Sequence, residues 1–104
     1  MKTKNSKSEY NEETAKQYIS DDKPIINVSS EVETQYKWIE GKRTDEVTGY
    51  KLYFTQEGVN PFVIKFVNNP VLPPFLSEVK LDNLQAIEIR SNVYFRSEGV
   101  RVVK

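Results

Sequence analysis

The sequence lacks both cysteine and histidine. Without cysteine there is no disulfide framework and no thiolate metal site, and without histidine the commonest metal ligand and general base is missing. Zinc chemistry and hydrolysis by a histidine-containing triad are therefore close to excluded. No catalytic motif stands out among the remaining residues. We expect a protein that is not an enzyme and that holds neither a cofactor nor a metal ion.

Glycine is scarce, and there is no excess of charge of either sign. The four glycines stand singly, so the chain has no glycine-rich phosphate loop. Lys and Arg together number 15, as do Asp and Glu, which gives a formal net charge of zero. No overall field therefore draws the protein to nucleic acid or to an anionic membrane. Any surface that binds an anion must be local.

Long apolar runs are also missing. The start of the chain lacks the apolar segment of a signal peptide, and no later segment approaches the roughly 20 apolar residues of a membrane span. We therefore expect a cytoplasmic protein with no membrane partner. A chain of 104 residues makes one domain near the lower end of the size that folds independently.

The composition divides the chain at about Lys23. Residues 1–23 are rich in Lys, Glu, Asn and Ser, with Ala15, Tyr18 and Ile19 as the only hint of a helical face. This pattern predicts a flexible polar tail with at most one transient turn. Residues 24–104 are predicted to form a single β-rich domain.

Apolar and polar residues alternate through "TQYKWIE", "YKLYFT" and "PFVIKFV", which predicts three neighbouring strands. "GKRTDEVTG" between the first two is polar and bounded by glycines, so it is predicted to be a long hairpin loop, and "EGVNP" is predicted to be the next turn. The residues that the alternation places on the core face are Tyr36, Trp38, Tyr50, Leu52, Phe54, Phe62, Ile64 and Phe66.

The second half of the domain is less uniform. "NNPVLPPFL" has three prolines and is predicted to be a loop or an extended crossover. Residues 76–90 fit two strands with a bend at Asp82 and Asn83, or a helix; alternating Ile87 and Ile89 favour the strands. "NVYFRSEGVRVVK" predicts a final strand with a kink near Gly99.

Five to six strands joined mostly by hairpins predict a mainly β fold, either a small antiparallel β-barrel of the oligonucleotide-binding (OB) type or a rolled sheet. One feature departs from the OB type. That fold usually has a helix between its third and fourth strands, where this sequence has the proline-rich segment.

The outward residues of the predicted strands combine basic and aromatic side chains. Bases stack on aromatic rings while ammonium and guanidinium groups meet phosphates, so this combination suits single-stranded nucleic acid. Ordinary exposed strand surface is the alternative, because Tyr and Lys are common there. The candidate nucleic-acid-binding residues are Lys37, Lys42, Arg43, Lys51, Tyr53, Lys65, Tyr94 and Arg96.

The stretches "WIEGKRTDEVTGYKLYF", "PFVIKF", "EVKLDNLQAIEI" and "NVYFRSEGVRVV" resemble small uncharacterised proteins encoded on conjugative and other mobile elements of Gram-positive bacteria. The resemblance covers about residues 33–103. It implies a role in handling DNA during transfer or replication of such an element, and it carries over no particular binding residue.

These observations predict a non-enzymatic accessory protein of a mobile element that binds single-stranded DNA. Two alternatives stay open: a protein-binding adaptor or inhibitor, and a winged-helix protein that binds duplex DNA if residues 76–90 are helical. A homodimer is also expected, because small domains with exposed edge strands gain stability by pairing them. The edges predicted for this pairing are "PIINVS" and the C-terminal "VRVVK".

Overall fold

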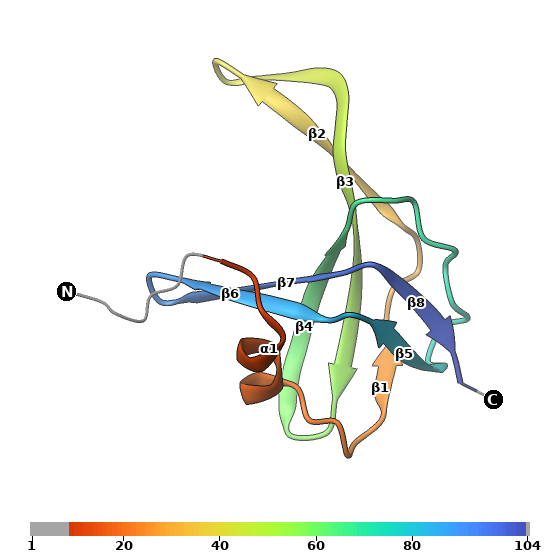
Figure 1. The fold of residues 1–104 in the computed structure, drawn as a ribbon. Coiled ribbons are helices and arrows are strands. Elements are labelled where there is room, and N and C mark those ends of the chain that lie inside the picture. Colours follow the sequence, from red (N-terminus) through yellow and green to blue (C-terminus); the bar gives the residue numbers. More distant parts are fainter. Residues whose placement is uncertain (1–8, 104) are drawn as a thin grey trace.

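The computed structural model describes residues 9–103, which form one short helix and eight strands (Figure 1). The elements in chain order are α1 (Glu12–Tyr18), β1 (Ile25–Asn27), β2 (Glu33–Ile39), β3 (Lys42–Gln56), β4 (Val59–Phe66), β5 (Glu78–Asp82), β6 (Gln85–Ile89), β7 (Asn92–Ser97) and β8 (Gly99–Val102). The expectation of a mainly β protein is confirmed. Among the described residues, no helix has the length and apolar character needed to cross a membrane.

The strands form one open sheet in the order β6-β7-β4-β3-β1-β5-β8, with β2 added to β3 outside this path. The expected closed barrel is therefore wrong, and the strands number eight rather than five to six. All neighbours are antiparallel except β4 and β7, which are parallel. The sheet stays open because β6 and β8, its two terminal strands, are not paired with each other.

Two bends account for part of the larger strand count. Asn83, with φ of 53°, lies in the break between β5 and β6, and Glu98 separates β7 from β8. The predicted bend at Asp82 and Asn83 and the predicted kink near Gly99 are thus confirmed. Residues 78–82 and 85–89 are strands, so the helical alternative is wrong. The winged-helix hypothesis loses its recognition helix with it.

The core lies between the inner face of β3 and β4 and the strands β5, β6 and β7. Leu52, Phe54 and Ile64 are fully buried and Phe66 is 1% exposed, as the alternation predicts. Phe95 on β7 packs against Phe62, with ring centroids 5.6 Å apart. Burying a side chain of this size contributes about 1.5–3 kcal/mol to folding, so this cluster holds the sheet together.

The segment expected as a long hairpin loop is strand instead. β2 and the first half of β3 form a two-stranded ribbon, which we call the arm (residues 33–49), and it projects from the rest of the protein, the body (Figure 1). Glu40 and Gly41 make its tight turn, with φ of 51° and 81°. Two residues with positive φ favour a hairpin over a loop because their twist matches that of the strands.

The arm also overturns two core assignments. Trp38 is 64% exposed and Tyr36 is half-buried, although alternation placed both on the core face. The physical reason is that β4 pairs only with residues 50–56 of β3. Beyond that point the ribbon has no third strand and no layer to pack on, so neither face of the arm is a core face.

The predicted polar tail is wrong for residues 9–23, and residues 1–8 lie outside the described part of the chain. The Asn11 side chain accepts a hydrogen bond from Thr14 N at 2.7 Å and so caps α1. Ala15 and Ile19 are buried in the core, 2% and 3% exposed. Buried Ala15 and Ile19, together with the Tyr18 ring against Phe95, thus hold a helix that its own polar sequence does not predict.

The proline-rich crossover between β4 and β5 contains neither helix nor strand, as expected. The fully buried Asn27 side chain donates to the carbonyl oxygens of Pro73 and Pro74 at 2.9 and 3.3 Å, which fixes the crossover to β1. β1 itself pairs with both β3 and β5, so it is not the free edge that we expected for dimerisation. β8 pairs only with β5 and is a terminal strand of the sheet.

Candidate nucleic-acid interface

Three basic residues from three strands form one row on the outer face of the body. In the register of the sheet, Lys51 on β3 lies opposite Lys65 on β4, and Lys65 lies opposite Arg96 on β7. Neighbouring strands are about 4.8 Å apart, so the three backbone positions span only about 10 Å. Like charges directly opposite each other destabilise a sheet. This row, which we call the basic row, is therefore an arrangement that the fold itself does not favour.

Neutralisation of the basic row is incomplete. Lys51 Nζ lies 3.8 Å from Glu33 Oε1 at one end of the row. At the other end Arg96 Nε donates to the amide oxygen of Gln85 at 2.8 Å, a neutral partner. Lys65, in the centre, forms no ion pair with any described residue. The centre of the row thus keeps its positive charge.

Gly49 leaves the space that the Lys65 side chain occupies. A Cβ atom at position 49 would lie 2.7 Å from Lys65 Cε and 3.1 Å from the carbonyl oxygen of Phe66. Gly49 does not have a positive φ, so its role is to leave space rather than to allow a special backbone conformation. The Lys65 stem lies across that space, at the junction between the body and the arm.

Tyr10 joins this site from the N-terminal segment. Its ring lies against the Arg96 guanidinium, with 4.2 Å between the guanidinium carbon and the ring centroid. The backbone of Asn11 exchanges two hydrogen bonds of 3.0 Å with Ala86 on β6, which fixes the adjacent residue. Tyr10 was not among the predicted site residues, because its segment was expected to be a flexible tail. Asn11 followed by Glu12 and Glu13 was the available signal, since Asn caps helices and acids favour the first turn.

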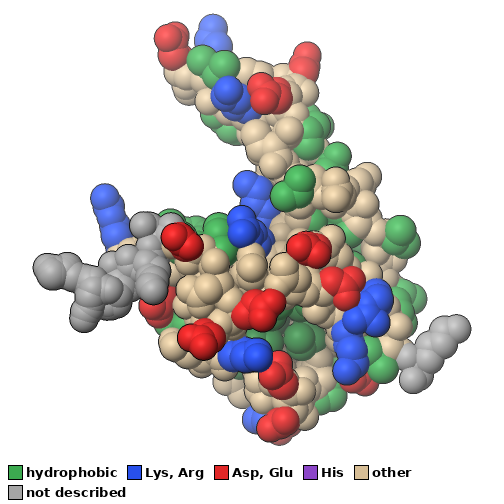
Figure 2. Space-filling view, viewed as in Figure 1, with side chains coloured by type: hydrophobic (Ala, Val, Ile, Leu, Met, Phe, Trp, Pro, Cys, Tyr) green, Lys and Arg blue, Asp and Glu red, His purple; other side chains and the backbone are tan. Residues whose placement is uncertain are grey.

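Two open grooves flank the basic row, and Tyr10 and Lys65 border both. One has a volume of about 740 Å³ and also borders Arg96, Gln85 and Glu98. The other has a volume of about 550 Å³ and reaches Lys51, Gln35 and Tyr94. In Figure 2 basic side chains gather where the arm joins the body. The site is a shallow surface channel rather than an enclosed pocket.

The two predicted tyrosines of this face differ in accessibility. Tyr94 on β7 is 47% exposed and borders the smaller groove. Tyr53 is half-buried, and its hydroxyl donates to Glu33 Oε1 at 3.1 Å. Burial, followed by this hydrogen bond to a carboxylate, raises the pKa of Tyr53 above its ordinary value. Tyr94 is the better placed of the two to contact a ligand.

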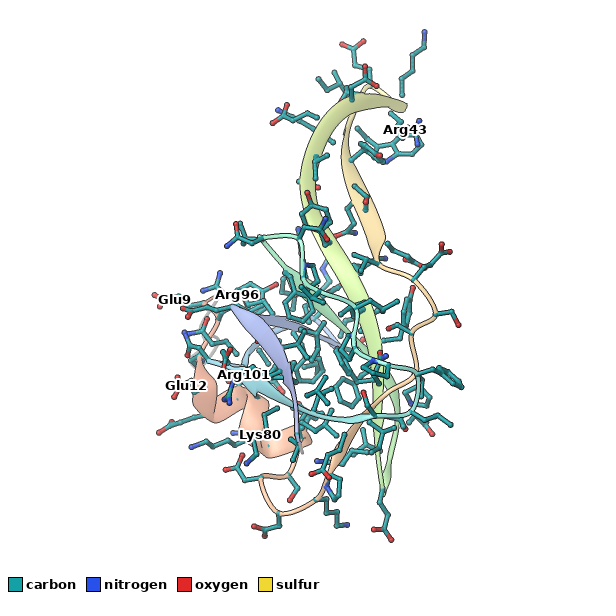
Figure 3. The ribbon with its side chains drawn as sticks, turned by 90° about the vertical axis from the view of Figure 1, so that its right-hand side faces the viewer. Glu9, Glu12, Arg43, Lys80, Arg96 and Arg101 are labelled. Carbon is teal, nitrogen blue, oxygen red and sulfur yellow. The ribbon has the colours of Figure 1, made fainter. Side chains whose placement is uncertain are left out.

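The remaining predicted residues, Lys37, Lys42 and Arg43, lie on the arm and not with the basic row. Lys37 Nζ is 4.0 Å from Glu46 Oε1, and the Arg43 guanidinium lies over the Tyr36 ring at 4.6 Å. Figure 3 shows Arg43 at the far end of the arm, well away from Arg96 on the body. The structure thus divides the eight candidates into a body group and an arm group.

The arm group also has a different charge balance. Residues 33–49 contain three basic residues, Lys37, Lys42 and Arg43, against four acidic ones, Glu33, Glu40, Asp45 and Glu46. Figure 2 shows acidic and basic side chains mixed at the tip. An arm with this balance has no net attraction for a polyanion.

Within residues 9–103 no group of three or more acidic side chains is arranged to hold a metal ion. In the comparisons with known proteins, no family model, no curated protein and no solved structure matches the chain.

Proposed function

We propose that the outer face of β3, β4 and β7 binds single-stranded nucleic acid, with DNA as the form that the sequence resemblance favours. The observation that carries this proposal is the basic row: Lys51, Lys65 and Arg96 are direct neighbours across three strands. A phosphate chain lying along the row relieves the repulsion between these cations. Binding then gains from released counterions as well as from direct contacts.

The strand connections support the same proposal by analogy. β5 and β6 can be treated as one bent strand, and so can β7 and β8. β1 and β2 both pair with β3 and count as one further segment. With β3 and β4 the sheet then consists of five chain segments. A partly open, five-stranded arrangement is that of the OB class. In that class the face of the second and third strands binds oligonucleotides. Here these strands correspond to β3 and β4, which carry Lys51 and Lys65.

Fluorescence anisotropy with labelled single-stranded and duplex oligonucleotides tests this function. We compare the parent protein with a body variant, Lys51→Gln with Lys65→Gln and Arg96→Gln, and with an arm variant, Lys37→Gln with Lys42→Gln and Arg43→Gln. Both remove three positive charges, so they are matched in net charge. The parent and the arm variant should bind single strands, and the body variant should lose binding by 10-fold or more.

Two results contradict the proposal. One is a parent protein that binds no single strand at low salt. The other is a body variant that binds as tightly as the parent while melting at the same temperature.

Protein binding through the arm is a second candidate function. Trp38, Ile39 and Val47 are 64%, 50% and 43% exposed, on the part of the ribbon that lies beyond the pairing with β4. Exposed aromatic and aliphatic residues of this kind anchor protein interfaces. A pull-down that compares the parent with Trp38→Ser tests this candidate. A partner retained by the parent and lost from the variant supports it, and identical sets of bound proteins contradict it.

The cellular setting stays a prediction from the sequence. The proposal has three further parts, which rest on the sequence: a role as an accessory of a mobile element, a cytoplasmic location and a homodimer. Of the two edges predicted for a dimer, β8 is the one that ends the sheet. A dimer mass in light scattering at tens of micromolar supports pairing through β8, and a monomer mass contradicts it.

A further inference from the structure

We propose that Tyr10 and Arg96 together form the platform on which a base of the bound strand stacks. This inference rests on the proposed function, since a base can stack here only if the body face binds nucleic acid. The platform gives that face a preference for strands whose bases are unpaired. The basic row alone accounts only for phosphate contacts, which carry no such preference. The platform therefore assigns a role to Tyr10 and names the part of the ligand that it recognises.

The position of Tyr10 is fixed by the backbone beside it. Asn11 N donates to the Ala86 carbonyl and Ala86 N donates to the Asn11 carbonyl, each at 3.0 Å. Asn11 also caps α1, whose residue Ala15 is in the core. A ring held in place before binding loses little conformational freedom when a base stacks on it. Tyr10 is thus ordered in advance, unlike a tyrosine on a tail.

Arg96 is held by two neutral partners. Its Nε donates to Gln85 at 2.8 Å, and its guanidinium lies 4.2 Å from the Tyr10 ring centroid. It forms no ion pair with the described residues, so these contacts orient the guanidinium without removing its charge. The Tyr10 ring offers an aromatic surface, and the Arg96 guanidinium offers a positive charge that no described carboxylate pairs with. Stacking on a ring beside such a charge is how sequence-tolerant single-strand binding is built.

Accessibility agrees with this role. Tyr10 is half-buried and borders the grooves on both sides of Lys65, which lie along the basic row. A strand whose phosphates contact Lys51 and Lys65 thus passes beside the Tyr10 ring. In a duplex the faces of the bases are covered by stacking and pairing. A ligand without bases, or with paired bases, gains only the phosphate contacts.

The protein contains its own control for this experiment. Tyr36 and Arg43 form a second tyrosine–guanidinium pair at 4.6 Å on the arm, away from the basic row. Tyr10→Leu and Tyr36→Leu therefore remove the same chemical group from equivalent pairs. We measure the binding of each by anisotropy with a labelled 12-mer of deoxythymidine and with an abasic 12-mer that has the same phosphates but no bases.

The parent should bind the deoxythymidine strand more tightly than the abasic strand. Tyr10→Leu should weaken deoxythymidine binding by roughly 10-fold and leave abasic binding within two-fold. Tyr10→Phe, which keeps the ring, should bind like the parent, and so should Tyr36→Leu. Thermal melting of each variant shows whether it is folded.

Each other outcome overturns a defined claim. If the parent binds neither strand, both the proposed function and the platform are wrong. If the parent binds both strands but Tyr10→Leu behaves like the parent, only the platform is wrong. An equal loss for both strands in Tyr10→Leu shows that Tyr10 merely positions Arg96, which also overturns base stacking.

Discussion

The arm and the body face are built from the same residue types, yet the charges that surround them differ. Each contains a tyrosine against an arginine, at 4.6 Å on the arm and 4.2 Å on the body. On the body the arginine joins a row of cations. On the arm it lies among acids that outnumber the basic residues. A basic-aromatic pattern thus has functional meaning only where the sheet places its members side by side.

The difference begins with the partners of β3. Residues 50–56 of this strand have neighbours on both sides, while residues 42–49 pair only with β2. A two-stranded ribbon has no core of its own and is of marginal stability in water. One half of β3 is therefore a rigid part of the body, and the other half is part of an exposed ribbon.

The largest expected difference between the two regions is in stability. Phe54→Ala removes a fully buried ring from the body and should lower the free energy of unfolding by about 3–5 kcal/mol. Trp38→Ala removes a ring that is 64% exposed on the arm and should change that free energy by no more than about 0.5 kcal/mol. Urea denaturation measures both. A loss above about 2 kcal/mol for Trp38→Ala contradicts an exposed position for this ring, because it requires a buried tryptophan.

Substitution of two glycines should have a smaller effect on stability and should separate the two regions by their effect on binding. Gly41 has φ of 81° in open space at the arm turn, so Gly41→Ala should cost about 1–2 kcal/mol and leave oligonucleotide binding unchanged. Gly49→Ala should lower the free energy of unfolding by about 1–3 kcal/mol, because its Cβ would meet Lys65 Cε and the carbonyl oxygen of Phe66. The displaced Lys65 should weaken single-strand binding. Paired thermal melts and anisotropy titrations check both variants, and equal effects on binding contradict the assignment.

Salt dependence gives a smaller effect. Lys65→Gln on the body should reduce the slope of log K against log salt by about 0.7, the value for one phosphate contact with a single strand. Lys42→Gln, at the start of β3 on the arm, should leave the slope unchanged. Anisotropy titrations at four salt concentrations give these slopes. A shallower slope for Lys42→Gln than for Lys65→Gln reverses the roles that we assign to the two regions.

The smallest effect concerns pH. The pKa of Tyr53 is raised by burial and by the adjacent Glu33, so the folded protein holds this proton more tightly than the unfolded chain. Its contribution to stability is complete below about pH 10 and is lost as the pH rises through the folded-state pKa. Tyr53→Phe has no such proton, so its stability should fall less steeply above about pH 10. Urea midpoints across this range test it, and identical curves count against it.

The alternating pattern determined part of the fold directly. Leu52, Phe54, Ile64 and Phe66 could be assigned to the core because neighbouring residues of a strand point to opposite faces. The strands on either side of Asn83 were also predictable. Their sequence alternates at period two, and Asn tolerates the positive φ of the bend.

Where alternation failed, the missing information was the extent of pairing. Trp38 alternates like a core residue, yet no third strand lies beside it. Tyr10 lies in a polar segment whose helix is held by Ala15 and Ile19, which are buried, and by the Tyr18 ring. In both cases a contact with a distant part of the chain, present or absent, decides the environment.

Composition and alternation were enough to predict a mainly β protein without histidine or cysteine chemistry, with basic and aromatic residues on the outward positions of its strands. Which of those residues meet depends on the tertiary structure. The register that joins Lys51, Lys65 and Arg96 depends on pairing between residues up to 31 positions apart, and the contact between Arg96 and Tyr10 spans 86 positions. Local pattern fixes the face of a side chain, whereas its neighbours on that face are set by long-range pairing.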